Sequence, residues 1–314
     1  MQAPSPDRAA SLLPPSVRLV VRGWLNCNQV VLRAPGAKVV VDSGYCTHAE
    51  ETLLLVQAAL EGESLAALVN THCHSDHMGG NAAIAARYDC SVSIPEGEVK
   101  HIVPWTPQSV WMAQFDQQAV PFEFHDTIAA GQSFEAGGLH WEAHAAPGHD
   151  MDALMFFNPE RRILISGDAL WENGMGFVWP EEGDNPHIDA AFEALATAER
   201  LAPSVVIPGH GVAFSDAARA IAVARSRLEA FSRDPVKNAR HVVKVMFVYA
   251  LLDKGAMAAG DVAAYLDRVP CYRRLAERFL RLDAAAMAGW LLGDLEKSGA
   301  VRIAQGLVFP TAAA

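Results

Sequence analysis

The most constraining feature of the chain is a short run in which three histidines and one aspartate fall within six residues. The run reads His72-Cys73-His74-Ser75-Asp76-His77 and follows the apolar segment Leu65–Val69. That segment has the length and composition of a buried strand. The Gly79-Gly80 pair beyond the run predicts a sharp turn into a helix over 81–87. The polar cluster is therefore expected on the loop at the carboxyl end of a central strand.

The residue types in this run are those that bind transition metals. Neutral imidazoles and carboxylates suit zinc, iron or manganese. Residues two apart at a strand end point the same way, so His72 and His74 are expected to share one ion. Asp76 and His77 lie further round the turn and can face a second ion. The dense spacing favours a metal site over a polar loop with scattered surface histidines.

Four other short motifs place polar side chains next to glycine at the ends of expected strands. In chain order they are Val41-Asp42-Ser43-Gly44, Pro147-Gly148-His149, Ser166-Gly167-Asp168 and Pro208-Gly209-His210. Together with the first run, they resemble the signature of the metallo-β-lactamase superfamily over about residues 18–215. The resemblance implies an α/β fold, an αββα sandwich of two mixed β-sheets flanked by helices. It also implies that Asp42 supports the metal loops from behind.

The same resemblance implies a site for two divalent metal ions. Its ligands would be nitrogen and oxygen atoms without a thiolate. Zinc is the default ion for such a set, with iron or manganese as alternatives. The implied ligands are His72, His74 and His149 for the first ion, Asp76, His77 and His210 for the second, and Asp168 as the bridge.

Two ions that share a bridging hydroxide lower the pKa of the parent water to near neutrality. Such a hydroxide attacks an acyl carbonyl, so no serine or cysteine nucleophile is needed, and Cys73 is expected to point away from the metals. The Asp168 bridge, with no cysteine ligand in its place, resembles the glyoxalase II, lactonase and phosphodiesterase-like branches. We predict a hydrolase of a thioester or lactone, of acyl-glutathione, acyl-CoA or acyl-lactone type, with Asp76 also in a catalytic role.

Two other functions are compatible with the same motifs. A mononuclear iron persulfide dioxygenase can keep the histidine run while it uses a single ion. A non-catalytic regulatory or binding module can keep the fold alone. The intact set of seven expected ligands argues against the module, because folding by itself does not require those residues.

Composition limits the partners. The chain has 314 residues and a formal net charge of −11, which argues against a nucleic-acid partner because phosphate binding needs a basic surface. It has no apolar stretch long enough to span a membrane, and its first residues show no signal-peptide pattern, so a cytoplasmic protein is expected. The five cysteines form no CxxC pair and are expected to be reduced. The expected partner is a small acyl substrate, and a homodimer stays open.

Three parts of the chain are expected from its composition. Residues 1–16 form a flexible arm, 17–215 a catalytic domain, and 216–314 a helical domain that resembles a winged helix. Two aromatic-rich segments, 95–126 and 169–187, are candidates for pocket walls, although the first can instead be a helical excursion. The expected strands are 17–21, 28–32, 38–41, 65–69, 91–94, 139–144, 154–157, 163–166, 205–207, 299–303 and 306–309, and the expected helices are 50–60, 81–87, 188–201, 216–232, 236–253, 258–267 and 271–297.

Overall fold

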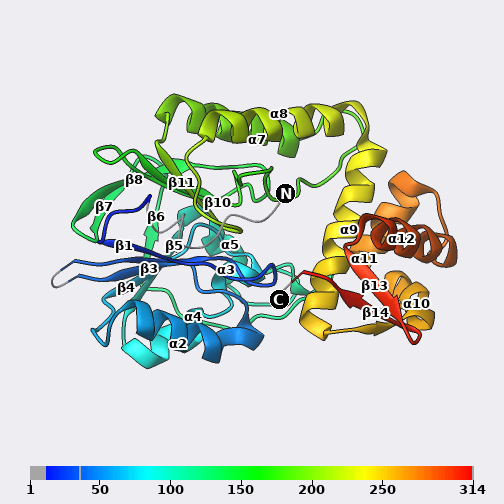
Figure 1. Ribbon diagram of the computed structural model, residues 1–314, viewed down its shortest axis with the longest axis horizontal. Helices are drawn as coiled ribbons and strands as arrows, with labels where there is room; N and C mark the ends of the chain where they lie inside the picture. Colours follow the sequence, from blue (N-terminus) through cyan, green and yellow to red (C-terminus); the bar gives the residue numbers. More distant parts are fainter. Residues whose placement is uncertain (1–11, 35–36, 313–314) are drawn as a thin grey trace.

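The computed structural model describes residues 12–34 and 37–312, so most of the predicted arm over 1–16 lies outside the described residues. Two β-sheets stack face to face, with helices on both outer faces and a helical C-terminal region at one end (Figure 1). This arrangement confirms the predicted αββα sandwich. Within the described ranges, none of the helices combines the length and the apolar character that crossing a bilayer needs.

The first sheet has six strands in the order β1-β2-β3-β4-β5-β6. Strands β1 to β3 are antiparallel, and β3 to β6 run parallel. Helices α2 and α4 cover its outer face at the bottom of Figure 1. The elements are β1 (Val17–Val20), β2 (Gln29–Leu32), β3 (Val39–Val41), β4 (Ala67–Val69), β5 (Ser91–Pro95), β6 (Asp126–Ile128), α2 (Ala49–Ala59), α3 (Ser75–Met78), α4 (Asn81–Tyr88), α5 (Val99–Ile102) and α6 (Met112–Phe115).

The second sheet has five strands in the order β11-β10-β9-β8-β7, of which only the β10–β11 pair is parallel. Strand β8 alternates buried and half-buried residues, whereas the central β9 and β10 are buried throughout, as expected for strands covered on both faces. Helices α7 and α8 cover this sheet. The elements are β7 (Ser133–Ala136), β8 (Leu139–Ala145), β9 (Leu154–Asn158), β10 (Ile163–Gly167), β11 (Val205–Pro208), α7 (Pro186–Leu201) and α8 (Ala217–Arg233).

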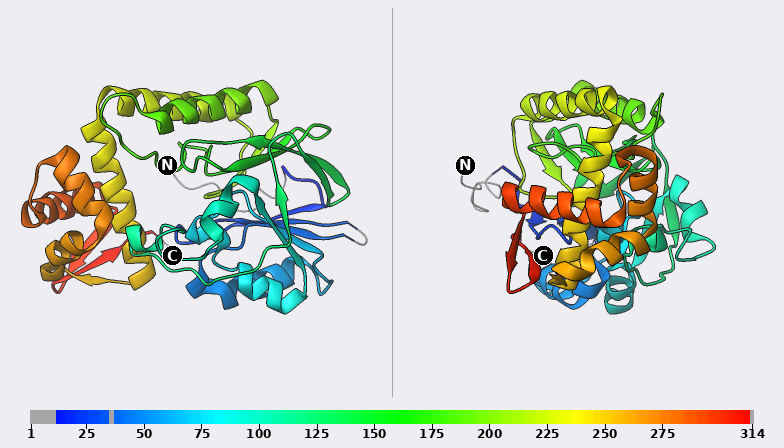
Figure 2. Two further views of the ribbon diagram at one scale, coloured as in Figure 1. Left: turned by 180° about the vertical axis from the view of Figure 1, so that it is seen from behind. Right: turned by 90° about the vertical axis from the view of Figure 1, so that its right-hand side faces the viewer.

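The C-terminal region is built on the long helix α9, which runs down the side of the sandwich (Figure 2). The predicted helix over 271–297 is wrong as a single element, because the chain turns at Arg281 in a left-handed conformation and restarts at the N-cap Asp283. The elements are α9 (Pro235–Lys254), β12 (Met257–Ala258), α10 (Val262–Arg268), α11 (Pro270–Leu275), a π-helical turn (Ala276–Leu280), α12 (Ala284–Ser298), β13 (Val301–Ala304) and β14 (Leu307–Pro310).

Packing favours a later division between the two parts than residue 215. Helix α8 buries Ile221, Leu228 and Phe231 in the same apolar cluster as α7 and the outer face of the second sheet. Helix α9, in contrast, contributes to a separate cluster with α10, α11 and α12. We therefore propose that the catalytic domain extends through α8. The winged-helix resemblance of the remainder stays a prediction.

Ion pairs join the C-terminal region to both aromatic-rich segments. Asp116, from the segment 95–126, accepts bonds from Lys254 at 3.1 Å and Arg268 at 3.2 Å. Glu181, from the segment 169–187, pairs with Arg278 at 3.0 Å and Arg274 at 3.6 Å. The C-terminal region therefore holds two segments that lie far from it in the sequence.

The Gly79-Gly80 pair allows a close backbone contact rather than the predicted sharp turn. Both residues have ordinary helical angles, with φ of −61° and −89°. A Cβ on Gly80 would lie 2.3 Å from the backbone oxygen of Ser43, and one on Gly79 would lie 2.5 Å from the backbone nitrogen of Cys46. Glycine is needed here because the loop after β3 passes directly over the chain that follows His72 to His77.

Replacing Gly80 by alanine is expected to lower the free energy of unfolding by about 2 kcal/mol, because the new methyl group overlaps backbone that cannot move cheaply. Gly293 in α12 is a matched control, since a Cβ there meets no atom within 4 Å. Gly293→Ala should stabilise the chain by roughly 0.5–1 kcal/mol through helix propensity. Urea unfolding of the metal-free proteins measures both, and equal effects of the two changes would contradict the close approach.

Candidate metal centre

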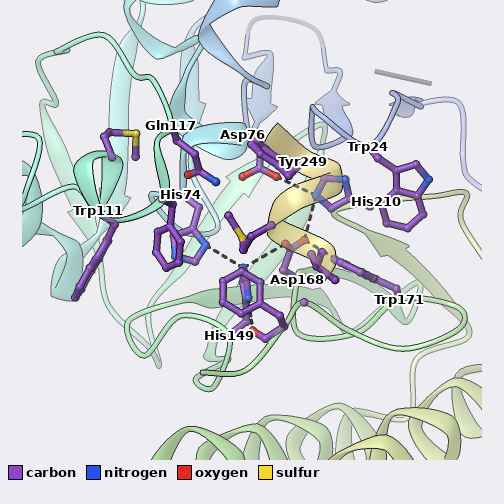
Figure 3. Close-up of a pocket in the computed structure, with 16 residues that line it drawn as sticks. Trp24, His74, Asp76, Trp111, Gln117, His149, Asp168, Trp171, His210 and Tyr249 are labelled. Atoms are coloured by element: carbon purple, nitrogen blue, oxygen red, sulfur yellow. Dashed lines mark hydrogen bonds and ion pairs between the residues drawn. The ribbon is translucent and has the colours of Figure 1, made fainter. Parts of the chain in front are cut away.

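The structure brings all seven predicted ligands to one edge of the sandwich, where the loops after the strands meet. Figure 3 labels His74, Asp76, His149, Asp168 and His210 around the cavity at this edge. The loops meet because each motif closely follows its strand and the parallel strands point the same way. The ligands come from the loop after β4 (His72 and His74), from α3 (Asp76 and His77), and from the loops after β8 (His149), β10 (Asp168) and β11 (His210).

The first group consists of His72, His74 and His149, each with a ring nitrogen within 4.8 Å of the others. The Nδ1 atom of His74 lies 2.9 Å from Nε2 of His149. The Nε2 atom of His72 is buried and has no hydrogen-bond partner among the described residues. Burial and the neighbouring His77 lower the pKa of His72 well below its usual value, and burial lowers that of His74 to about 4. Both rings are therefore neutral, as metal ligands must be.

The second group consists of Asp76, His77, Asp168 and His210, and all four are buried. Nε2 of His210 lies 3.1 Å from Oδ2 of Asp76, and Nε2 of His77 lies 3.4 Å from Oδ1 of Asp168. Like His72, His77 has a buried Nε2 atom that finds no hydrogen-bond partner in the described part of the chain.

Asp168 lies between the two groups. Its Oδ1 faces His77, and its Oδ2 lies 3.5 Å from Nε2 of His149 in the first group. Although burial opposes ionisation, His210 and His77 hold the pKa of Asp168 well below its usual value. One ionised carboxylate therefore presents one oxygen to each group, which is the position a bridging ligand needs.

This donor set fits divalent metal ions. A buried nitrogen without a hydrogen-bond partner costs about 1–3 kcal/mol, and His72 and His77 each leave one. A cation in each group would satisfy the buried nitrogen of that group and offset the charge of the carboxylates. The structure thus has candidate histidine and aspartate metal sites, while the role of each ligand and the identity of the ion stay predictions.

Asp42 supports the site from behind, as the resemblance implied. Its Oδ2 accepts a hydrogen bond from Nδ1 of His77 at 2.8 Å, and its Oδ1 accepts one from the backbone N–H of Thr71 at 2.8 Å. The first bond fixes the His77 ring so that Nε2 faces the site. Such carboxylate–histidine contacts orient metal ligands and raise their basicity.

A second support was not predicted from the sequence. Oδ2 of Asp150 lies 3.5 Å from Nε2 of His74, and the buried Glu98 accepts a hydrogen bond from the backbone N–H of Cys73 at 2.9 Å. Burial and the adjacent Asp150 raise the pKa of Glu98 well above its usual value. Glu98 belongs to the irregular segment 95–126, and no spacing signal connects it to the histidine run.

Two adjoining cavities lie at the metal centre. The inner one, of about 90 Å³, is lined by ligands and by Trp24, Gln117, Met246 and Tyr249. The outer one, of about 330 Å³, is lined in part by His187, at the end of the aromatic-rich segment 169–187. Both cavities share His74, Trp111, Phe115, His149 and Phe177. The segments 95–126 and 169–187 are therefore pocket walls, and α9 adds Met246 and Tyr249.

Several side chains at the inner cavity position the ligands. The Trp24 ring stacks on the His210 ring at a centroid distance of 5.5 Å, and Nε1 of Trp171 donates to Oδ1 of Asp168 at 3.1 Å. The Tyr249 hydroxyl lies 3.2 Å from Oγ of Ser75, which ties α9 to α3, the helix that carries Asp76 and His77. The sequence gave no indication of the Tyr249 contact, since 174 residues separate the pair.

The residues 22–210 match the family model of the metallo-beta-lactamase superfamily. The chain belongs to this superfamily. Among curated proteins it is 29% identical over 143 residues to a hydroxyacylglutathione hydrolase of Bdellovibrio bacteriovorus, covering 46% of this chain and 47% of that protein. A hydroxyacylglutathione hydrolase of Rhodopseudomonas palustris is 28% identical over 153 residues, covering 49% and 50%. The chain thus spans about half the length of the curated relatives it matches.

Solved structures show the same fold at lower identity. A metallo-beta-lactamase family protein from Thermus thermophilus matches 95% of this chain and 99% of its own, with a TM-score of 0.55 and 20% identity. A beta-lactamase domain protein from Burkholderia ambifaria matches 96% and 93%, with a TM-score of 0.56 and 21% identity. Both matches include the C-terminal region, so its attachment to the sandwich recurs in other proteins of this fold.

Replacing Asp42 by asparagine is expected to weaken metal binding about 10- to 100-fold, because the His77 ring loses its carboxylate partner. Competition with a chelator of known affinity measures the change. Asp267→Asn, at an exposed position of α10, is the matched control and should leave the affinity at the wild-type value. Equal affinities for both variants would show that Asp42 does not support the site.

Proposed function

We propose that this protein is a metal-dependent hydrolase that cleaves a thioester or lactone. The observation that carries the proposal is the carboxylate of Asp168, placed between two groups of buried nitrogen and oxygen donors. The hydroxyacylglutathione hydrolase relatives support the same reaction class. A small acyl molecule is the proposed substrate.

Two divalent ions, zinc by default, would supply a polarised carbonyl and a water whose pKa is near neutrality. We assign His72, His74 and His149 to the first ion, with Asp168 between the ions. Asp76, His77 and His210 would hold the second ion. These assignments use every donor in the two clusters. They also give a metal partner to the buried Nε2 atoms of His72 and His77, which have no hydrogen-bond partner among the described residues.

The protein's own side chains prepare the site in two ways. Asp76 lies at the inner cavity, and His77 and His210 lower its pKa against the opposing effect of burial, so it stays ionised. An ionised carboxylate there can accept a proton from an attacking water and hold that water in place. The stacked Trp24 and the Trp171 hydrogen bond limit movement of His210 and Asp168, which keeps the donors preorganised.

The two competing functions receive less support. A single-ion dioxygenase would need only the first group of histidines, yet the second group is also a close set of donors and is more buried than the first. A binding module would have no reason to retain buried imidazoles without hydrogen-bond partners. The earlier predictions of a cytoplasmic location and of a homodimer are not tested by the structure and stay predictions.

Asp168→Ala is expected to remove both bound metal and hydrolysis, because the two groups lose their shared carboxylate. Metal content by elemental analysis and turnover of thioesters and lactones, with and without chelator, measure the two effects together. Asp184→Ala, at an exposed position before α7, is the matched control and should keep both. Full turnover by Asp168→Ala, or turnover that resists chelator, would overturn the proposed function.

A further inference from the structure

The outer cavity is enclosed mainly by aromatic side chains. Trp111, Phe115, Phe177 and Trp179 line it, and the exposed Met151 lies at its rim. The Phe115 ring packs edge-to-face on Phe177 at 6.1 Å and on Trp179 at 5.9 Å. The three rings therefore form a continuous apolar wall, and the C-terminal core supports it from behind.

Trp111 stands where the two cavities join. It lines both of them, and its side chain remains 44% exposed. Its φ angle is 62°, a left-handed conformation that is costly for a bulky side chain. Strained residues of this kind concentrate at ligand clamps, where the surrounding structure holds them in place. The position suits a side chain that closes over a bound substrate.

The charged groups of the outer cavity are already paired. Lys100 lies 2.7 Å from Asp152. Arg274 lies 3.6 Å from Glu181 and covers the Trp179 ring at 5.4 Å. With Asp150, the described lining has three carboxylates against two cations. The lining therefore carries no net positive charge that would attract an anionic group on a substrate.

We infer that the outer cavity binds the apolar acyl chain of a thioester or lactone whose leaving group is uncharged. This inference rests on the proposed function. With the carbonyl at the metal centre, the acyl chain would extend past His74 and His149 into the aromatic wall. A leaving group at the metal centre would lie on the inner cavity, whose described lining includes no lysine or arginine. Glutathione carries two carboxylates and coenzyme A carries phosphates, and burying such anions without a cation is unfavourable. Thioesters of a neutral thiol are therefore preferred over thioesters of glutathione.

The test is a chain-length series on the metal-loaded full chain. The substrates are butanoyl, hexanoyl and octanoyl thioesters of N-acetylcysteamine, a neutral thiol, and octanoyl-glutathione. Each methylene buried in the cavity contributes ~0.8 kcal/mol, or three- to fourfold in kcat/KM. We expect a rise of roughly 80- to 250-fold from butanoyl to octanoyl. We expect octanoyl-glutathione to react at least about tenfold more slowly than the neutral octanoyl thioester.

Trp179→Ala tests the wall, because Trp179 lines the outer cavity and not the inner one. We expect the gain per methylene to fall below about twofold as contact with the chain is lost. Trp290→Ala is the matched control, since Trp290 contacts Arg240 on the C-terminal helices, and it should keep the wild-type gain. The gain is a ratio within one protein, so a loss of folded material does not change it.

The outcomes separate the two proposals. Chelator-sensitive turnover that does not depend on chain length would overturn the inference and leave the hydrolase intact. Faster turnover of octanoyl-glutathione than of the neutral thioester would overturn the uncharged leaving group. If Trp179→Ala keeps the wild-type gain in kcat/KM per methylene, the aromatic wall is not the binding site of the chain. No turnover of any thioester by fully loaded protein would overturn the proposed function, and the inference with it.

Discussion

Buried imidazole nitrogens and carboxylate oxygens that converge at one site are the constraint on which this structure depends. His72 and His77 each carry a buried Nε2 that lacks a hydrogen-bond partner within the described residues, and Oδ1 of the ionised Asp168 lies 3.4 Å from that of His77. Such an arrangement is costly in a folded protein unless a cation completes it. The stacked sheets, the close loop contact at Gly80 and the support from Asp42 together hold these donors in place.

The donors are held by a second layer of polar contacts that differs between the two groups. Asp42 fixes His77 from the loop after β3. Asp150 and Glu98 lie behind His74 and the backbone of Cys73. The rings of His77 and His74 thus each have one nitrogen directed to the site and the other facing a carboxylate of the protein, which limits their rotation.

The outer cavity is lined largely by segments other than those that carry the candidate metal ligands. The segments that carry Phe115 and Trp179 are held by ion pairs between Asp116 or Glu181 and the C-terminal helices. All of the lining residues of the cavity except Arg274 lie within residues 22–210, which match the superfamily model. The outer cavity therefore belongs mainly to the superfamily region, and the C-terminal helices hold its walls in place.

The sequence by itself predicted most of the strands, because strand patterns are local, and the resemblance of its motifs to those of the metallo-β-lactamase superfamily implied the sandwich and the candidate ligands. It could not determine the packing of α8 on the second sheet, the break at Arg281, or the contacts of Glu98 and Tyr249. These depend on segments that meet only after folding; Tyr249 and Ser75 are 174 residues apart. The aromatic walls likewise lack a periodic signal. Tertiary structure alone decided that their rings face a cavity and that its charges are already paired.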